Sequence, residues 1–269
     1  MKKGRLFEKI AVVTGASSGI GRATAIGLAE EGAKVALMAR REDRLQEVAQ
    51  EIQKKGGEAW ILPLDVTLSD KVREGVEKVL QKWGHIDLLI NNAGFGLSAR
   101  VEEMTSENLH QLMEVNLFGP FYGIQAVLPH MRRQGQGHII NVATVGSKVS
   151  FPFYSGYCAS KFALLALNDA LRMELHGTGI QVSIVLPAAT ETEFFETASR
   201  LSGRTFRPVG MVQSAQTVAQ SIIRCAIRPK PRVYPLYPSR WLGLFNEIAP
   251  GWVDFLSIRY RDRIAAEKG

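Results

Sequence analysis

Tyr157 and Lys161 are the two side chains of this sequence whose types and spacing best suit proton-transfer chemistry. They begin a run, Tyr157 to Leu175, that contains no Gly or Pro and is predicted to be helical. Residues four apart lie on one face of a helix, about one turn from each other. A phenol has a pKa near ~10, and a neighbouring ammonium lowers it by favouring the phenolate. The pair is a candidate general acid/base, although the same spacing also arises by chance.

The composition favours one α/β domain over residues 1–269, because 46% hydrophobic and 22% charged residues are ordinary for a protein with a buried core. Cys158 and Cys225 give no disulfide framework, which favours a reducing cytoplasm. The five histidines have no paired spacing, so no metal site is expected. The basic start, Met1 to Arg5, runs directly into a strand-like segment and does not predict a signal peptide.

The net charge of +7 is concentrated near the C-terminus. Residues 224–269 contain nine Lys/Arg and four Asp/Glu, so five of the seven net positive charges lie there. The rest of the chain is nearly neutral, which argues against a nucleic-acid partner.

A glycine-rich turn follows the first apolar run, Lys9 to Thr14, which is predicted to be a buried parallel strand. The turn precedes a predicted helix, Arg22 to Glu31, and this arrangement suits a dinucleotide pyrophosphate, because glycines let the backbone approach the phosphates. A tight turn without a ligand is the alternative. The candidate cofactor residues in the turn are Gly15, Ser17, Ser18, Gly19, Ile20 and Gly21.

Arg40 and Arg41 follow the second predicted strand, Lys34 to Ala39, where an NAD site would carry an acidic residue. A guanidinium suits a 2′-phosphate, so the pair predicts NADP(H) rather than NAD(H). A solvated basic pair at the start of the next helix, Arg41 to Lys55, is the alternative.

Polar or small residues also follow the third and fourth predicted strands, Glu58 to Leu64 and Ile86 to Ile90. After the third strand, Asp65 could accept a hydrogen bond from an adenine amine, with Val66 beside it. Its alternative role is to cap the helix Val72 to Trp83, which Ser69 or Asp70 suits better. After the fourth strand, the turn Asn91, Asn92, Ala93 and Gly94 suits either a ligand-binding edge or a plain turn.

The helical tract Ser106 to Arg133 is interrupted at Asn116 and Pro120. A mid-helix Asn is a poor helix former, and Pro120 frees the carbonyl of Asn116. We expect a kink, which either directs polar groups into a site or serves packing alone.

Thr144 lies just after a fifth predicted strand, His138 to Val142, and thirteen residues before Tyr157. A sixth strand, Ile180 to Leu186, ends at Pro187. Strands alternate with helices throughout, so the fold is expected to be α/β, with a doubly wound parallel sheet and helices on both faces.

Together these motifs resemble the short-chain dehydrogenase/reductase family, a Rossmann-type group of nicotinamide-dependent oxidoreductases. The matching residues are Thr14 to Gly21, Asp65-Val66, Asn91 to Gly94, Asn116, Thr144, Tyr157 and Lys161. The resemblance implies that Tyr157 is the general acid/base. It also implies that Lys161 holds the nicotinamide ribose and lowers the Tyr157 pKa, and that Asn116 supports a water linked to Lys161. A homodimer or homotetramer is expected.

Two positions depart from the family pattern. Thr144 stands where the family usually has Ser, so the hydroxyl is kept and its methyl narrows the pocket. Pro187 is followed by Ala188 instead of Gly, and Thr192 corresponds to a family threonine near the carboxamide. Tyr154 is a weaker acid/base candidate, because the residue four positions on is Cys158.

The substrate is expected to be an apolar or bulky carbonyl or alcohol. Its pocket should be lined by Phe95, Val145 to Phe153, Pro187 and the segment after Thr192. Strand–helix alternation fails there, and residues 192–211 are predicted to form a lid. The phenylalanines that suggest apolar contacts are Phe151, Phe153, Phe194 and Phe195.

Residues 229–269 form a C-terminal extension with an expected strand at Arg232 to Tyr234 and helices at Ser239 to Ile248 and Trp252 to Arg263. Aromatic side chains beside arginines suit the surface of an anionic membrane. Alternatively, the aromatics cover the substrate pocket or a subunit interface. A regulator that binds nucleotide without turnover is the other functional alternative, because fold does not guarantee activity.

Overall fold

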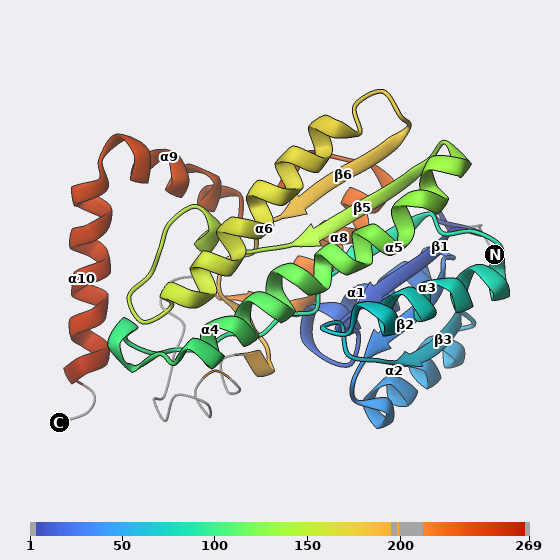
Figure 1. Ribbon diagram of the computed structural model, residues 1–269, viewed down its shortest axis with the longest axis horizontal. Coiled ribbons are helices and arrows are strands. Elements are labelled where there is room, and N and C mark those ends of the chain that lie inside the picture. The colour runs from blue at the N-terminus through green and yellow to red at the C-terminus, as the bar shows by residue number, and fades with distance from the viewer. Residues whose placement is uncertain (1–3, 195–197, 199–211, 267–269) are drawn as a thin grey trace.

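A parallel β-sheet forms the centre of the computed structural model, which describes residues 4–194, 198 and 212–266, with side chains to residue 259 (Figure 1). Within those residues, the sheet has seven strands in the order β3-β2-β1-β4-β5-β6-β9. The strands are β1 (Ile10–Thr14), β2 (Lys34–Ala39), β3 (Glu58–Pro63), β4 (Leu88–Asn91), β5 (Gly137–Val142), β6 (Ile180–Val185) and β9 (Arg232–Val233). The expected α/β parallel sheet is confirmed.

The strands are apolar along their whole length because both faces of the sheet are covered. All five residues of β1 are buried. Alternate residues point to opposite faces: Ala11 and Val13 belong to one hydrophobic core, while Ile10 and Val12 belong to the other.

The helices lie in two layers, one on each face. On the first face, α1 (Gly19–Glu30), α2 (Glu42–Lys54) and α8 (Ala215–Ile227) bury apolar stripes on the sheet. On the second face, α3 (Ser69–Trp83), α5 (Gly119–Gln134) and α6 (Ser155–Glu174) do the same. Helix α8 was not expected from the sequence.

The predicted tract Ser106 to Arg133 is divided into three segments. Helix α4 (Ser106–Met113) is followed by a π-helical segment, Glu114–Phe118, and then by α5. Pro120 follows the π segment within a continuous helix, because Phe118 and Gly119 also have helical backbone angles. A π segment in place of a simple kink is a common feature of functional sites.

The C-terminal extension stands at the end of the molecule to which β5 and β6 point (Figure 1). It contains β9, then α9 (Arg240–Ile248) and α10 (Pro250–Ala266). Helix α9 packs against the turn after β5, where a Cβ on Gly243 would lie 3.2 Å from Lys148 Cβ. Among the described residues, no helix is both long and apolar enough to cross a bilayer.

Most of the predicted lid lies outside the described residues. The chain before it forms β7 (Thr190–Glu191), which pairs with β8 (Gln213–Ser214). The described residues Thr192 to Phe194 follow β7, while residues 195–197, 199–211 and therefore Phe195 are not described.

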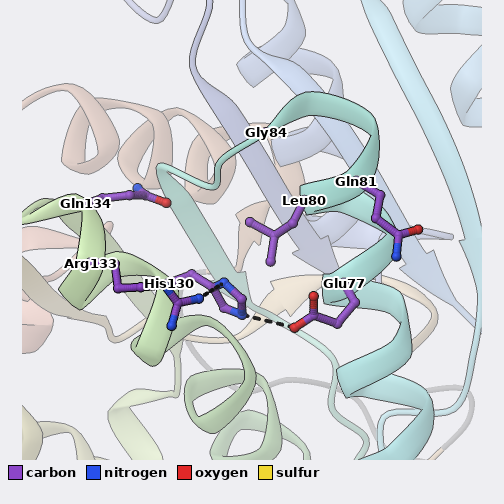
Figure 2. Close-up of a pocket in the computed structure, with 7 residues that line it drawn as sticks. All are labelled: Glu77, Leu80, Gln81, Gly84, His130, Arg133 and Gln134. Atoms are coloured by element: carbon purple, nitrogen blue, oxygen red, sulfur yellow. Dashed lines mark hydrogen bonds and ion pairs between the residues drawn. The ribbon is translucent and has the colours of Figure 1, made fainter.

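A surface pocket lies between α3 and α5 (Figure 2). In it, His130 Nε2 lies 3.1 Å from Glu77 Oε1, and His130 Nδ1 lies 2.6 Å from Arg133 Nη2. Both helices end beside it, immediately before β4 and β5 begin. The pocket is therefore at the amino edge of the sheet, and its lining includes none of the predicted site residues.

His138 makes the stability of this sheet depend on pH. Its ring is buried at the start of β5, and Nε2 lies 2.8 Å from Ser183 Oγ on β6. Burial lowers the pKa of His138 to about 4. In the unfolded chain, the His138 imidazole has its ordinary pKa of ~6.5. As the pH is lowered from 6.5 to 4, the unfolded state therefore binds the proton first, and the free energy of unfolding should decrease by up to about 3 kcal/mol.

The variant His138→Gln removes the titration and keeps a polar partner for Ser183. Denaturant unfolding at several pH values should show a shallower acid loss than in the wild-type protein. His176→Gln is the control, because His176 is exposed. An unchanged acid loss in His138→Gln would contradict the assignment.

Candidate active site

The predicted site residues gather at the carboxyl edge of the sheet, around β1, β4, β5 and β6. The strand order reverses direction between β1 and β4. Ligands of open parallel sheets bind at such a switch point, outside the carboxyl ends of the strands.

The glycine turn after β1 has no room for side chains at two of its positions. A Cβ on Gly21 would lie 2.1 Å from the Gly15 carbonyl oxygen, and one on Gly15 would lie 2.8 Å from Ala93 Cα. Gly15 and Gly19 also have positive φ values, 64° and 53°, which favour glycine. The turn therefore keeps its backbone open to a phosphate at the N-terminus of α1.

Thr14 joins this turn to the one after β4. Its hydroxyl oxygen accepts hydrogen bonds from the backbone N–H groups of Asn92 (3.0 Å) and Ala93 (3.1 Å). The Asn92 side-chain amide donates to the carbonyls of Thr14 (3.1 Å) and Gly15 (3.3 Å). The side chain of Asn92 thus fixes the two loops to each other.

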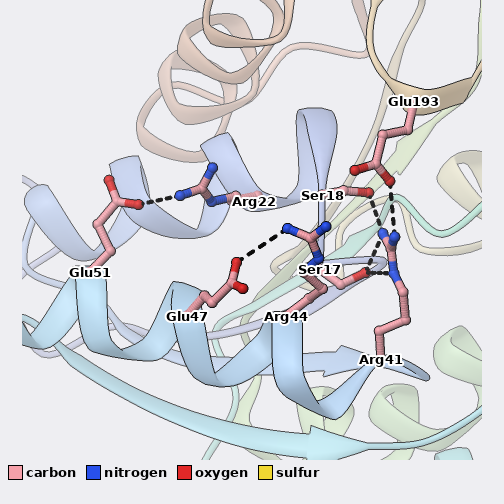
Figure 3. A network of polar contacts seen from close by, with 8 residues as sticks. All are labelled: Ser17, Ser18, Arg22, Arg41, Arg44, Glu47, Glu51 and Glu193. Atoms are coloured by element: carbon pink, nitrogen blue, oxygen red, sulfur yellow. Dashed lines mark hydrogen bonds and ion pairs between the residues drawn. The ribbon is translucent and has the colours of Figure 1, made fainter.

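Arg41 lies over the glycine turn (Figure 3). Its Nη2 donates to Ser18 Oγ at 2.8 Å and to Ser17 Oγ at 3.2 Å. Its Nη1 donates to Glu193 Oε2 at 2.9 Å. The Arg41 guanidinium is therefore fixed beside the glycine turn.

Arg40 points to a different partner, with its Nη1 3.8 Å from Asp65 Oδ2. Asp65 Oδ1 accepts from the backbone N–H and the hydroxyl of Thr67, at 3.0 and 2.9 Å. The prediction that Asp65, Ser69 or Asp70 is the N-cap of α3 is wrong. The N-cap residue is Leu68, which makes no side-chain capping hydrogen bond. Val66 is buried and packs on Gly119.

Asn116 is buried in the π segment, and its side chain is held by three hydrogen bonds. Its Oδ1 accepts from Phe95 N at 3.0 Å, and its Nδ2 donates to the Phe95 carbonyl (3.0 Å) and to Ser160 Oγ (3.1 Å). Ser160 in turn donates to the Tyr157 carbonyl at 2.7 Å. Sequence reasoning missed Ser160, although it lies three residues after Tyr157, on the same face of the helix.

Lys161 is buried, and its Nζ donates to the Val142 carbonyl at 3.1 Å. Burial lowers the pKa of Lys161 to about 8. A Cβ on Gly94 would lie 3.3 Å from Lys161 Nζ and 2.9 Å from Asn116 Oδ1. A side chain at position 94 would therefore clash with Asn116 and crowd the Lys161 ammonium.

Tyr157 and Thr144 face the same cavity. Burial raises the pKa of the Tyr157 phenol above its ordinary value, a thiolate at Cys158 would raise it further, and the neighbouring Thr144 hydroxyl lowers it by less. This direction is opposite to the one expected from the Lys161 ammonium, because desolvation of the buried phenol has the largest effect. The phenol is therefore protonated near neutral pH.

Thr144 is held in place by the backbone around it. Its hydroxyl donates to the Pro187 carbonyl at 3.3 Å and accepts from Gly146 N at 3.2 Å. Ala188 N donates to Gln213 Oε1 at 3.0 Å, a contact the sequence did not suggest. The alternative acid/base, Tyr154, is buried and lines the same cavity.

The cavity encloses about 570 Å³ and, among the described residues, its lining contains no Asp, Glu, Lys, Arg or His. Of the phenylalanines expected to line it, Phe151 and Phe194 do, whereas Phe95 and Phe153 do not. The other expected residues that line it are Val145, Gly146, Val149 and Pro187. Sequence reasoning placed no particular residue of the C-terminal extension here. Those that line it are Leu236, Pro238, Ser239, Leu242, Val253, Leu256 and Ser257. The extension therefore borders the pocket, but the alternative that its aromatic side chains cover the pocket is wrong, because none of the lining residues from the extension is aromatic.

Known proteins resemble this chain over most of its length. Residues 9–201 match the family model described as short chain dehydrogenase. An uncharacterized oxidoreductase of Staphylococcus saprophyticus is 43% identical over 188 residues, which are 69% of this chain and 76% of that protein. An uncharacterized oxidoreductase of Staphylococcus epidermidis is 34% identical over 225 residues, which are 84% of this chain and 94% of that protein.

Solved structures of related proteins also resemble this chain over most of its length. An alcohol dehydrogenase from the archaeon Thermococcus sibiricus, complexed with 5-hydroxy-NADP, has a TM-score of 0.73 and 33% identity, covering 84% of this chain and 94% of that one. A metagenomic short-chain oxidoreductase in complex with NADP has a TM-score of 0.75 and 30% identity, covering 86% and 98%.

The parallel sheet with helices on both faces and a glycine turn at the switch point defines a Rossmann-type protein. Within that class, the match over residues 9–201 is decisive. The chain belongs to the short-chain dehydrogenase/reductase family of oxidoreductases.

Proposed function

We propose that this protein transfers a hydride between NADP(H) and an apolar carbonyl or alcohol substrate. The observation that carries the proposal is the convergence of Tyr157 and Thr144 on one cavity whose described lining is uncharged, with Lys161 buried beneath it. A charged substrate would lose its hydration in such a cavity without gaining a counter-ion.

Each catalytic side chain has a distinct role in the proposed reduction. Bound NADPH would supply the hydride to the carbonyl carbon. Tyr157 donates its hydroxyl proton to the carbonyl oxygen, and Thr144 donates a hydrogen bond to the same oxygen as negative charge develops on it. Burial keeps Tyr157 protonated but makes it a weaker acid, which the positive charge of Lys161, one helical turn away, would offset. Lys161 holds a positive charge close by, and Asn116 positions the backbone of Phe95 and the hydroxyl of Ser160.

The cofactor residues fit a dinucleotide that carries a 2′-phosphate. Gly15, Gly19 and Gly21 leave the backbone open, and Arg41 is fixed beside Ser17 and Ser18. Ile20, Pro187 and Thr192 line the cavity from the cofactor side. Two of the similar structures were determined with 5-hydroxy-NADP and NADP, which supports the same choice here.

The acid/base assignment predicts a large loss of activity in Tyr157→Phe, because the ring remains but the proton is gone. Thr144→Ala should lower kcat by about 100-fold or more, as for the loss of an oxyanion donor. Thr144→Ser keeps the hydroxyl and should be mild. The assay follows nicotinamide absorbance with a panel of apolar aldehydes and ketones, and NADPH binding is measured separately.

If Tyr157→Phe still binds NADPH, the variant is folded and its loss of activity is due to the missing hydroxyl group. Wild-type rates in Tyr157→Phe would refute the assignment. Binding of NADPH without turnover of any carbonyl or alcohol would favour the regulator without activity.

The cofactor assignment predicts that NADPH binds better than NADH. Arg41→Ala should weaken NADPH binding by roughly ten- to a hundredfold, typical of one charge-assisted contact, and should leave NADH nearly unchanged. Arg40→Ala should have a smaller effect, because Arg40 lies beside Asp65 and its side chain is 74% exposed. Calorimetric titration of both cofactors checks this, and equal affinity of the native protein for both would contradict it.

A second function, contact with a membrane surface, is favoured by the outer faces of α9 and α10. Large apolar side chains there are exposed, among them Phe245 (63%), Trp252 (71%) and Phe255 (50%). The Arg240 guanidinium lies 4.2 Å from the Trp241 ring centroid, and that of Arg259 lies 5.5 Å from the Phe255 ring centroid. Aromatics paired with arginines suit an anionic headgroup layer.

We expect the protein to sediment with anionic vesicles at low salt and to be released as salt rises. The double variant Trp252→Ser and Phe255→Ser should abolish sedimentation but keep activity, because neither residue lines the cavity. Met173→Ser, which removes an apolar side chain on α6 whose exposure (63%) lies between those of Trp252 and Phe255, is the control. A protein that stays in the supernatant, and whose oligomer dissociates in the double variant, would indicate a subunit interface instead.

A further inference from the structure

Three consecutive residues after β7, Thr192 to Phe194, touch three separate parts of the candidate site, and we call this segment the strap. Thr192 packs on the glycine turn, where a Cβ on Gly19 would lie 3.0 Å from Thr192 Cγ2. The Phe194 ring meets the Tyr157 ring edge-on, with centroids 5.2 Å apart. Between these contacts, Glu193 reaches Arg41.

Glu193 uses the same guanidinium that the proposed function assigns to the 2′-phosphate. Arg41 Nη1 donates to Glu193 Oε2 at 2.9 Å, while Nη2 and Nε donate to the serines of the glycine turn (Figure 3). A guanidinium presents the same planar fork of donors to a carboxylate and to a phosphate. The Arg41 hydrogen bond also holds the pKa of Glu193 below its usual range, so this carboxylate is ionised at neutral pH.

The neighbouring arginines are paired within the helical layer. Arg22 Nη2 lies 2.7 Å from Glu51 Oε2, and Arg44 Nη1 lies 3.4 Å from Glu47 Oε2 (Figure 3). Arg41 differs from them, because its carboxylate partner comes from a segment 152 residues away in the chain. The pair therefore connects the strap to the cofactor side of the site.

We propose that Glu193 occupies the place of the cofactor 2′-phosphate on Arg41, so that a 2′-phosphate must displace this carboxylate from the guanidinium. The inference rests on the proposed use of NADP(H). A dinucleotide without the 2′-phosphate leaves the Glu193–Arg41 pair in place. Glu193 is thus a specificity-determining residue whose effect depends on the 2′-phosphate.

The test measures binding of 2′,5′-ADP and of ADP by calorimetry, so that no turnover is needed. Glu193→Gln should bind 2′,5′-ADP about two- to fivefold more tightly than the wild-type protein, the range expected for an exposed ion pair. Both side chains of this pair are nearly half exposed. Binding of ADP should not change.

A double-mutant cycle shows whether the effect passes through Arg41. In an Arg41→Ala background, Glu193→Gln should no longer improve 2′,5′-ADP binding. If the gain persisted there, Glu193 would act by general repulsion of phosphate, and the proposal would be overturned. Glu191→Gln is the matched control, since it removes the same charge two residues away on the exposed side of β7 and should change neither affinity.

The two proposals fail in different ways. If the wild-type protein prefers 2′,5′-ADP over ADP but Glu193→Gln binds both as the wild type does, only the role of Glu193 is overturned. If the wild-type protein binds both nucleotides equally, the NADP(H) assignment is overturned and the role of Glu193 falls with it.

Discussion

Burial of the sheet on both faces is the constraint from which the rest of this structure follows. Every residue of β1 is buried, and the two cores lie on opposite sides of the same strands. A strand of this kind has no solvated face on which to carry polar side chains, so the polar groups of the site collect where strands end. The glycine turn, the Asn92 loop and Thr144 all occupy that position.

Burial also sets the electrostatics of the site. Lys161 is 4% exposed and has one protein acceptor in the described structure, the Val142 carbonyl. Its ammonium is costly there, and its pKa falls to about 8, while the pKa of the Tyr157 phenol rises. The sequence suggested a phenolate beside an ammonium. In the structure, burial favours the neutral form of both side chains, so that Tyr157 keeps its proton more tightly and Lys161 loses its proton more easily.

Hydrogen bonds between buried side chains lead from β4 and β5, in the centre of the sheet, toward the C-terminal extension. The Asn91 side-chain amide donates to Asn141 at 2.9 Å, and that of Asn141 donates to Asn168 at 3.0 Å. The next residue, Asp169, pairs with Arg232 on β9. The extension that closes the cavity is therefore anchored to the middle of the sheet through hydrogen bonds as well as through its own packing. A buried amide without a hydrogen-bond partner destabilises the folded state. These contacts therefore favour the one arrangement in which every amide is paired.

The sequence by itself determined the strands of the central sheet, most helices and the residue types of the site, because hydrophobic period, glycine spacing and helix propensity are local properties of the chain. Gly15, Gly19 and Gly21 were predicted from spacing, and the structure supplies the backbone angles and close approaches that require them. Tyr157 and Lys161 were placed on one helix face by their four-residue separation alone.

Only the tertiary structure decided which distant residues meet. Three contacts join residues that lie 25 to 152 positions apart in the sequence, and no local pattern predicts them. They are the contacts of Ser160 with Asn116, Gln213 with Ala188, and Glu193 with Arg41. The same holds for Leu242 and Leu256, whose aromatic-rich helices suit a membrane, a subunit interface or a pocket wall equally well by composition. Leu242 and Leu256 reach the cavity through the packing of α9 on the turn after β5. Contacts between distant segments depend on the course of the whole chain, whereas hydrophobic periodicity depends only on the conformation of each segment.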